Sequence, residues 1–553
     1  MKNKSFLFLA FIISCFNACS KKSTGPAGNT NHAPLAILSS NGSPHAPLIV
    51  DFTVTASDVD GDALTYNWDF GDGAKKNGTN KESHTYAADK AYTIKVDVSD
   101  GKASPVTVTT TLNTTVTIVT VDASVKYQSM DGFGGFGAKD VYWGGGPFTS
   151  TDFANTLITD LGLTILRDNV PTDFEAVNDN SDPNVTDLSK FDLTTSIKDH
   201  FQYLKDMKAA GLDKLIVSIW SAPAWMKTNN NVNGKAAGAP AYNPNPTAAD
   251  NQLRTDMYQE FAERCVAYIK IIKQQTGIDI YAISLQNEPR FTEPYESSVF
   301  DGNALRDLVK VVGKRFADDA VTTKIFLPED IGYLDGVSGM VLPTLNDPVA
   351  RQYTSIIAVH GYALDGVTAN SPDALTWQTM YSWGAQYTMP LWMTETSGFS
   401  NDIKGAMDLA KAMYTAINFG NVSAWLHWQL SQQTLDSYSL MSSSGEKSKR
   451  YFVSKNFYRY VRPGDERIKS SAPDGTNVFP LAFKNNVAAT NTIVIINDNT
   501  ESHIIKLNGA SLPPQFSLYV TSATDDCKDY GTVNTSDAFS IPAKSVVTLY
   551  KKG

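Results

Sequence analysis

Cysteine and histidine are scarce in this chain, with four cysteines and seven histidines among 553 residues. Cys15 and Cys19 fall in the first nineteen residues, which leaves only Cys265 and Cys527 for the rest of the chain. A framework of disulfides is therefore not expected to hold the fold together. A zinc cluster is not expected either, because such a site draws several cysteines or histidines together.

The chain also lacks an excess of positive charge and, beyond its first residues, any long apolar run. Lysine and arginine number 47 against 57 aspartates and glutamates, which gives a net charge of −10. Nucleic acids and anionic membrane surfaces select basic partners, so neither is expected to bind here. With 42% hydrophobic residues at this length, the composition is that of a globular protein with more than one domain.

Residues 1–19 have the pattern of a secretory signal peptide. Two lysines precede the apolar run Phe6–Ile13, which is too short to span a bilayer, and small residues follow it. Phe16-Asn-Ala-Cys19 resembles a bacterial lipobox, which implies that Cys19 is lipidated. An ordinary signal peptide that contains a cysteine by chance is the alternative. Residues 20–31 have the composition of a flexible linker.

This N-terminus predicts export across the inner membrane and a lipid anchor in the outer membrane, on its periplasmic or cell-surface face. Lys21 and Lys22 make the segment after Cys19 basic, which favours the periplasmic face. The lipid anchor is the only membrane contact expected, and a monomer is expected.

Residues 32–114 form a predicted small all-β module. Runs such as Ile49–Thr55 and Tyr92–Val98 alternate in polarity, as half-buried strands do, and turn residues separate them. The motif Tyr66–Gly73, with His84-Thr-Tyr86 after it, resembles the polycystic-kidney-disease-type (PKD) module. The resemblance implies an immunoglobulin-like sandwich that serves as a spacer or associates with carbohydrate.

Three aspartates of this module, Asp58, Asp60 and Asp62, alternate around Gly61. Carboxylate oxygens at such a spacing can ligate Ca²⁺, so a structural calcium ion is one interpretation. A solvated acidic turn is the other interpretation, and the sequence leaves both open. No other cofactor is expected.

Between residues 131 and 454, short apolar runs alternate with amphipathic stretches whose apolar residues recur every three or four positions. Eight such strands with helices between them predict an α/β fold, a (β/α)8 TIM barrel. An open doubly wound sheet is the alternative, but the run Gly132–Gly137 lacks the acidic partner of a dinucleotide-binding loop. The predicted strands are Phe133–Ala138, Leu163–Arg167, Leu215–Trp220, Tyr281–Gln286, Ile325–Leu327, Ile356–His360, Leu391–Thr394 and Ser423–Trp428.

The last part of the chain, residues 455–553, is again all-β, with strand-like runs such as Asn491–Asn497 and Ser545–Tyr550. Residues 115–130 are strand-like as well and would stay unpaired on their own. We therefore predict that they join the C-terminal strands in a side β-sandwich. The predicted fold is thus multidomain, with an all-β module, a barrel and a second β-domain.

Two glutamates stand out because each ends a predicted barrel strand. Glu288 closes Ile283-Ser-Leu-Gln-Asn-Glu288 after strand four, and Glu395 closes Leu391-Trp-Met-Thr-Glu395 at strand seven. Active sites of such barrels form at the C-terminal ends of the strands, and strands four and seven lie across the barrel from each other. Hydrolysis of a glycosidic bond requires a facing carboxylate pair, in which one group donates a proton and the other attacks or activates water.

Four motifs of the barrel and the segment after it are distinctive: Met130–Gly135, Ser284–Pro289, Trp392–Glu395 and Lys455–Gly464. Together they resemble those of glycoside hydrolase family 30, within the clan A retaining β-glycosidases. The resemblance covers residues 115–553 and includes the side β-sandwich. It implies that Glu288 is the acid/base and Glu395 the nucleophile, with a covalent glycosyl-enzyme intermediate and carboxyl groups roughly 5 Å apart.

Further residues are candidates for substrate binding. By the resemblance, Asn287 bonds the sugar 2-hydroxyl, and His360 and Tyr362 hydrogen-bond the nucleophile. Arg167 ends strand two and could anchor a hydroxyl or a neighbouring carboxylate. Three tryptophans near strand ends could stack on sugar faces or belong to the core, namely Trp220, Trp225 and Trp428.

The substrate is a polysaccharide or oligosaccharide of undetermined linkage. The best-known branch of the family cleaves glucuronoxylan and holds the glucuronate with an arginine just after strand eight. Trp428–Leu440 contains no arginine, although Lys449 and Arg450 follow. Because a spacer and a lipid anchor suit a polymer, the preferred function is an endo-β-glycanase on a xylan-type or β-1,6-linked glucan or galactan. The alternatives are an exo-acting β-glucosidase, β-xylosidase or β-fucosidase, and a non-catalytic glycan-binding lipoprotein.

Overall fold

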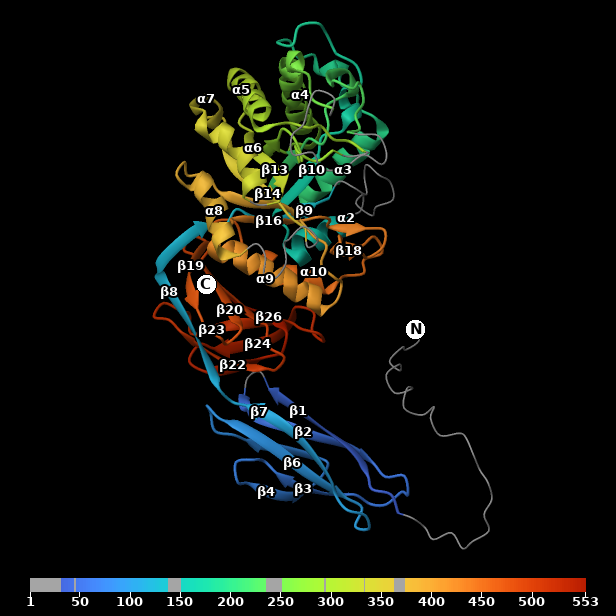
Figure 1. Ribbon diagram of the computed structural model, residues 1–553, viewed down its shortest axis with the longest axis vertical. Coiled ribbons are helices and arrows are strands. Elements are labelled where there is room, and N and C mark those ends of the chain that lie inside the picture. Colours follow the sequence, from blue (N-terminus) through green and yellow to red (C-terminus); the bar gives the residue numbers. More distant parts are fainter. Residues whose placement is uncertain are drawn as a thin grey trace, which may run out of the picture. The chain divides into compact units, whose positions relative to one another are not determined.

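The computed structural model describes residues 31–43, 46–137, 151–234, 251–292, 295–332, 334–362 and 373–553. Cys19, the predicted signal peptide and nearly all of the predicted linker lie outside the described residues. The chain forms two compact units. The first consists mainly of strands β1–β7, and the second contains the remaining elements (Figure 1).

The first unit contains two β-sheets around one apolar core, which confirms the predicted all-β module. In β6 (Ala91–Ser99) every second side chain from Tyr92 to Val98 is buried while those between are exposed. Trp68 and Phe70 stack in the same core with ring centroids 5.7 Å apart. The first sheet has the strand order β1 (Leu35–Ser43), β2 (Ala46–Ser57), β5 (Lys81–Thr85). The second sheet has the order β4 (Lys75–Gly78), β3 (Thr65–Asp69), β6, β7 (Val106–Asn113).

Eight parallel strands close into a barrel in the second unit, and this confirms the predicted (β/α)8 fold (Figure 1). Each strand pairs with the next along the chain, and β16 pairs with β9 to complete the ring. Apolar side chains such as Phe326, Trp392 and Leu426 fill its interior. The strands are β9 (Gly132–Phe136), β10 (Ile165–Asn169), β11 (Lys214–Ser218), β12 (Ile280–Ser284), β13 (Lys324–Ile331), β14 (Thr354–His360), β15 (Leu391–Thr396) and β16 (Ala424–His427).

The glycine-rich run near residue 134 forms the first barrel strand, β9. A Cβ atom at Gly134 would lie 1.8 Å from the carbonyl oxygen of Ile165 in β10. A Cβ atom at Gly135 would lie 2.7 Å from the carbonyl oxygen of His427 in β16. These glycines are therefore explained by the close approach of neighbouring strands, and no phosphate-binding loop is needed to account for them.

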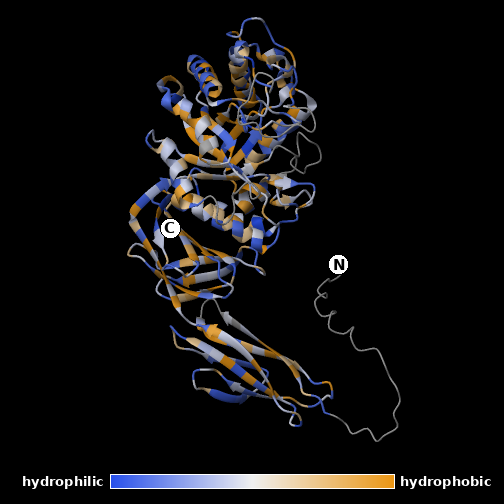
Figure 2. Ribbon diagram, viewed as in Figure 1, coloured by the Kyte–Doolittle hydropathy of each residue, from blue (hydrophilic) through white to orange (hydrophobic). Residues whose placement is uncertain are grey.

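Helices surround the barrel, and several begin and end at residues suited to capping. Thr194 accepts a hydrogen bond from the Ile197 N–H at the start of α3, and Gly211 ends that helix with a φ of 106°. Asp301 caps α5 in the same manner. Figure 2 shows hydrophilic and hydrophobic residues interspersed along the helices, as expected for elements with one buried face. The longer helices are α3 (Thr195–Ala210), α4 (Tyr258–Thr276), α5 (Gly302–Asp318), α6 (Asp335–Asn346), α8 (Ala374–Ala385), α9 (Ile403–Phe419) and α10 (Lys449–Tyr458).

A nine-stranded sheet follows the barrel, and the strand that precedes the barrel belongs to it. Strand β8 (Val116–Ser129) pairs antiparallel with β19 (Glu466–Ser471) and parallel with β22 (His503–Asn508). Helix α10 attaches the sheet to the barrel, because Asn456 Nδ2 donates to Thr548 Oγ1 at 2.9 Å. The other strands are β20 (Val478–Asn485), β21 (Thr490–Asn497), β23 (Gln515–Thr521), β24 (Lys528–Asn534), β25 (Ala538–Ile541) and β26 (Ser545–Lys552).

Cys265 and Cys527 are buried and are not joined by a disulfide. Within the described ranges, no helix combines the length and the apolar character needed to cross a membrane.

Candidate active site

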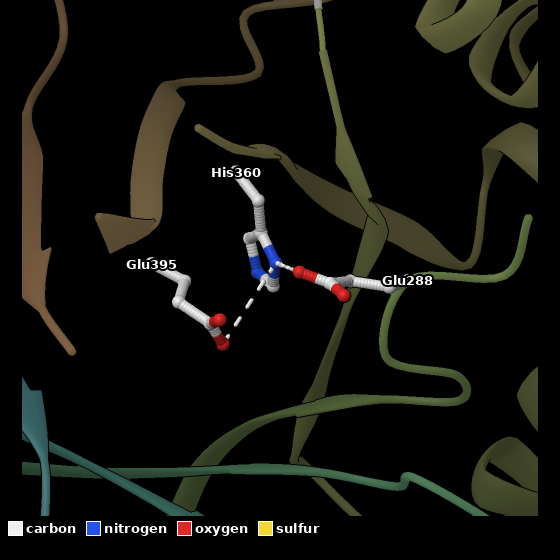
Figure 3. A group of neighbouring side chains, drawn as sticks. All are labelled: Glu288, His360 and Glu395. Atoms are coloured by element: carbon white, nitrogen blue, oxygen red, sulfur yellow. Dashed lines mark hydrogen bonds and ion pairs between the residues drawn. The ribbon is translucent and has the colours of Figure 1, made fainter. Parts of the chain in front are cut away.

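The two predicted carboxylates meet at one end of the barrel. Glu288 follows β12, and Glu395 is the second-last residue of strand β15. They are 8% and 4% exposed, respectively. One oxygen of each and one nitrogen of His360 all lie within 4.8 Å of one another, with the imidazole between the two carboxylates (Figure 3). The structure therefore brings together two acidic residues that are 107 positions apart in the chain.

Arg167 fixes the position of Glu395. Its Nη1 donates to Glu395 Oε2 at 2.5 Å, and its Nη2 donates to Asn287 Oδ1 at 2.6 Å. Tyr362 donates its hydroxyl hydrogen to the other oxygen of Glu395. Both carboxylate oxygens thus have a donor, and the charge-assisted bond from arginine holds the group in one orientation. The sequence predicts that Arg167 anchors either a hydroxyl or a neighbouring carboxylate. In the structure it anchors a neighbouring carboxylate, Glu395.

His360 differs from the prediction that it hydrogen-bonds Glu395. Its Nδ1 lies 2.9 Å from Glu288 Oε1 and its Nε2 lies 3.3 Å from Glu329 Oε1, whereas the nearest oxygen of Glu395 is 3.8 Å away. The pairing of β14 with β15 shifts register at this residue, and the ring reaches Glu288 and Glu329 instead. The prediction holds for Tyr362 alone.

Glu329 is a member of the site that the sequence did not reveal. It lies in β13, is fully buried, and accepts a hydrogen bond from Arg167 Nε at 2.9 Å. Its carbonyl oxygen also accepts the Glu288 N–H at 2.8 Å. Burial alone would raise its pKa, but the charge of Arg167 and the bond to His360 outweigh burial and lower that pKa to about 2.

The electrostatic environment changes the pKa of Glu288 and of its neighbour His360. Burial raises the pKa of Glu288 to about 7, and the negative charge of Glu395 adds to the effect while His360 opposes it. Burial lowers the pKa of His360, but Glu395, Glu288 and Glu329 together raise it to about 9. An imidazolium at neutral pH can donate to Glu288 and Glu329 at once. Because burial and Glu395 outweigh His360 and raise the pKa of Glu288 to about 7, Glu288 can carry a proton close to Glu395.

Aromatic side chains lie beside the carboxylates. Phe136 stacks on Trp428 with centroids 4.3 Å apart, and Trp220 contacts both rings. The guanidinium carbon of Arg167 lies 4.8 Å from the Trp220 ring centroid. Trp225 is not part of this group, because its indole N–H donates to the Glu175 carbonyl and its ring packs on the outer core. Trp428 is half-buried and Trp220 is buried, so Trp428 is the better candidate for stacking on a sugar.

Lys449 and Arg450, the cations after β16 noted in the sequence, both have partners within the protein. Arg450 is fully buried and donates to the carbonyl oxygens of Phe399 and Ser439, at 2.8 and 2.7 Å. Lys449 pairs with Asp526 at 2.6 Å.

The acidic turn of the first unit has partners of its own. One oxygen each of Asp58, Asp60 and Asp62 lie within 4.8 Å of one another. Asp60 pairs with His32 at 3.1 Å, and Asp62 pairs with Lys102 at 2.6 Å.

Buried carboxylates at the mouth of a (β/α)8 barrel, with an arginine and a tyrosine on one of them, are typical of glycoside hydrolases. Residues 156–443 match the model of the glycosyl hydrolase family 30 TIM-barrel domain, and residues 31–116 match that of the PKD domain. The first match covers more than half of the chain, and the chain belongs to glycosyl hydrolase family 30.

Known relatives include two polysaccharide hydrolases. Glucuronoxylanase XynC of Bacillus subtilis is 26% identical over 325 residues, which cover 56% of this chain and 70% of that protein. Endo-1,6-beta-D-glucanase neg1 of Aspergillus fumigatus is 26% identical over 185 residues, 33% of this chain and 36% of that protein. The solved family 30 subfamily 8 xylanase Xyn30A from Clostridium acetobutylicum has a TM-score of 0.62 and 26% identity, covering 79% of this chain and 99% of that one.

Proposed function

We propose that this glycoside hydrolase is a retaining endo-β-glycanase, with Glu288 as its acid/base and Glu395 as its nucleophile. The observation that carries the proposal is the short separation of the two carboxylates, with one oxygen of each within 4.8 Å. Retaining enzymes have carboxyl groups about 5–5.5 Å apart, whereas inverting enzymes leave about 6.5–9.5 Å for a water molecule.

The proposed reaction has two displacement steps. Glu395 attacks the anomeric carbon while Glu288 donates its proton to the leaving glycosidic oxygen, so one C–O bond forms as the other breaks. Glu288, now ionised, then removes a proton from a water molecule. That water attacks the anomeric carbon and releases the carboxylate of Glu395. The sugar leaves with its original anomeric configuration, and Glu288 is protonated again.

The neighbouring residues support each step. Arg167 and Tyr362 hold Glu395 for attack, and we propose that Asn287, which Arg167 orients, bonds the sugar 2-hydroxyl. His360 is a positioning residue for Glu288, with Glu329 as its anchor. Trp428 is proposed to stack on a sugar ring.

We expect kcat/KM to fall as the pH rises through about 7. Glu288 must hold a proton to protonate the leaving group, and its pKa is raised to about 7, so the active form predominates below that pH and is lost above it. The measurement is kcat/KM on a soluble polysaccharide from pH 4 to 9. A basic limb near pH 4.5, the ordinary value for a glutamic acid, would contradict the assignment.

The proposed substrate is a xylan-type or β-1,6-linked backbone without a need for acidic branches. The named activities of the Bacillus, Clostridium and Aspergillus relatives support such polymers. The engagement of Lys449 and Arg450 argues against recognition of a glucuronate by the segment after β16.

Product analysis on a panel of β-glycans tests the proposal. Incubation with unbranched xylan, glucuronoxylan, β-1,6-glucan and β-1,6-galactan should give internal oligosaccharides from at least one backbone. Proton NMR of the first product should show the β-anomer. Release of only terminal monosaccharide would indicate an exo-acting β-glycosidase instead, and an initial α-anomer would refute retention.

We also propose that Cys19 carries a lipid that anchors the protein in the outer membrane, facing the periplasm or the cell surface, and that the PKD module acts as a spacer. The support is the sequence Phe16-Asn-Ala-Cys19 after an apolar run. Incorporation of labelled palmitate into the wild type but not into Cys19→Ala would be expected. Equal labelling of both proteins would refute the anchor.

A further inference from the structure

A second group of carboxylates lies away from the proposed catalytic pair. Glu260 and Glu263 are one turn apart on α4, so their side chains share a face of that helix. Asp179 belongs to the connection between β10 and α3 and approaches the same face. One oxygen of each of these three residues lies within 4.8 Å of the others.

Several oxygens of this group have no hydrogen-bond partner. Glu263 is 1% exposed, and both of its buried carboxylate oxygens lack a partner of ordinary geometry. Glu260 is 7% exposed; its Oε1 accepts from Asn178 Nδ2 at 3.2 Å, but its Oε2 has no partner. Asp179 accepts from Asn180 and Asp187 through Oδ2 and leaves Oδ1 buried and unbonded. Four buried oxygens are thus available to a ligand.

The surrounding charge also calls for a cation. Glu175 is 1% exposed, and its Oε2 lies 3.9 Å from Arg264 and has no hydrogen bond. Burial raises the pKa of Glu175 to about 8; Arg264 opposes this rise, and Asp179 and the two glutamates of α4 add to it. Arg315 is held by Asp319 at 3.3 Å. Four carboxylates therefore share two nearby cations, Arg264 beside Glu175 and Arg315 beside Glu263, and buried charge without a partner is costly.

We propose that Asp179, Glu260 and Glu263 bind a Ca²⁺ ion. The available ligands are carboxylate oxygens, which Ca²⁺ prefers and which suit zinc less well than nitrogen or sulfur. Ligand oxygens at 2.3–2.6 Å from Ca²⁺ are at most about 5 Å apart, and the three observed oxygens satisfy this limit. Glu263 has two buried oxygens without a hydrogen bond of ordinary geometry, although Thr186 and Arg315 lie near it, so it can bind bidentately, and water can supply the remaining ligands.

The ion would stabilise one wall of the catalytic face. Asp179 lies in the segment that follows β10, the strand that carries Arg167. The Trp225 indole donates to the Glu175 carbonyl at 3.2 Å, which joins this segment to the connection after β11. Binding of Ca²⁺ would tie both connections to α4. Its effect is therefore expected on thermal stability first, without any part in the chemical steps.

Calcium titration of the full mature chain tests the proposal. After treatment with EDTA and removal of the EDTA, isothermal titration calorimetry should detect the binding of one Ca²⁺ per chain. This binding should require Asp179, Glu260 and Glu263. Glu263→Gln keeps the side-chain shape and should weaken binding at least tenfold. The matched control is Asp58→Asn/Asp62→Asn in the acidic turn of the first unit, which should leave this binding event unchanged.

Thermal unfolding gives an independent measurement that does not require a variant. Saturating Ca²⁺ should raise the wild-type Tm by at least about 2 °C over EDTA. Without calcium, Glu263→Gln should be at least as stable as the wild type, because it removes an unpaired buried charge, and its response to Ca²⁺ should disappear. If Glu263→Gln does not fold, Asp179→Asn serves in its place. No calcium-dependent rise in the wild-type Tm would overturn the proposal, as would binding lost only in the Asp58→Asn/Asp62→Asn control.

Discussion

Glu395→Ala is expected to lower kcat by about 10⁴-fold or more, because no covalent intermediate can form without the carboxylate. The substitution also leaves a space beside the anomeric carbon, next to the donors of Arg167 and Tyr362. A small anion such as azide can occupy that space and attack an activated aryl β-glycoside directly. We therefore expect azide to restore release of the phenol and to yield an α-glycosyl azide, detected by NMR.

Glu395→Gln is the matched control for this rescue. The amide fills the same volume, so azide should not restore activity, although the loss of kcat should be of the same order. Activity of Glu395→Ala within tenfold of the wild type would refute the role of Glu395 as nucleophile. A β-glycosyl azide would refute direct attack from the face that Glu395 occupies.

Glu288→Gln is expected to lower kcat on a polysaccharide by about 10²–10⁴-fold, the usual contribution of a positioned acid or base. The loss should depend on the leaving group. A dinitrophenyl glycoside leaves without protonation, so the first step should stay fast while the second step, which needs Glu288 as a base, becomes slow. The measurement is a burst of dinitrophenol equal to the enzyme concentration, followed by a slow steady state.

The pH profile gives a second check on Glu288. On the polysaccharide, whose leaving group needs protonation, the residual activity of Glu288→Gln should lose the basic limb near pH 7. Glu296→Gln is a suitable control, because Glu296 is another largely buried glutamate whose pKa burial raises. It should retain the limb. If the basic limb persists in Glu288→Gln and disappears in Glu296→Gln, the titrating group is Glu296, and the assignment of the limb to Glu288 is wrong.

The sequence was sufficient to predict the barrel and its central pair because both depend on local patterns. Short apolar strands alternate with amphipathic helices, and Glu288 and Glu395 each close such a strand. Arg167 was found for the same reason, since it closes the predicted strand Leu163–Arg167, although β10 continues to Asn169.

Glu329 escaped prediction because the apolar run of its strand stops at Leu327, whereas β13 continues to Ile331. Two consecutive carboxylates inside a strand look like a turn unless their partners are known. Those partners, Arg167 for Glu329 and Arg290 for Asp330, lie far away in the chain. The direction of the His360 ring could not be predicted either, because it depends on a register shift between two strands.

The position of β8 between β19 and β22 has a consequence for how the chain folds. Lys126 of β8 and Glu466 of β19 form an ion pair at 2.7 Å although they are 340 positions apart. During synthesis β8 leaves the ribosome before the barrel, yet its hydrogen-bonding partners appear only after the barrel is complete. Loop closure over such a span is slow, so docking of β8 is expected late in folding. A fragment that ends with the barrel would leave β8 as an unpaired edge open to aggregation.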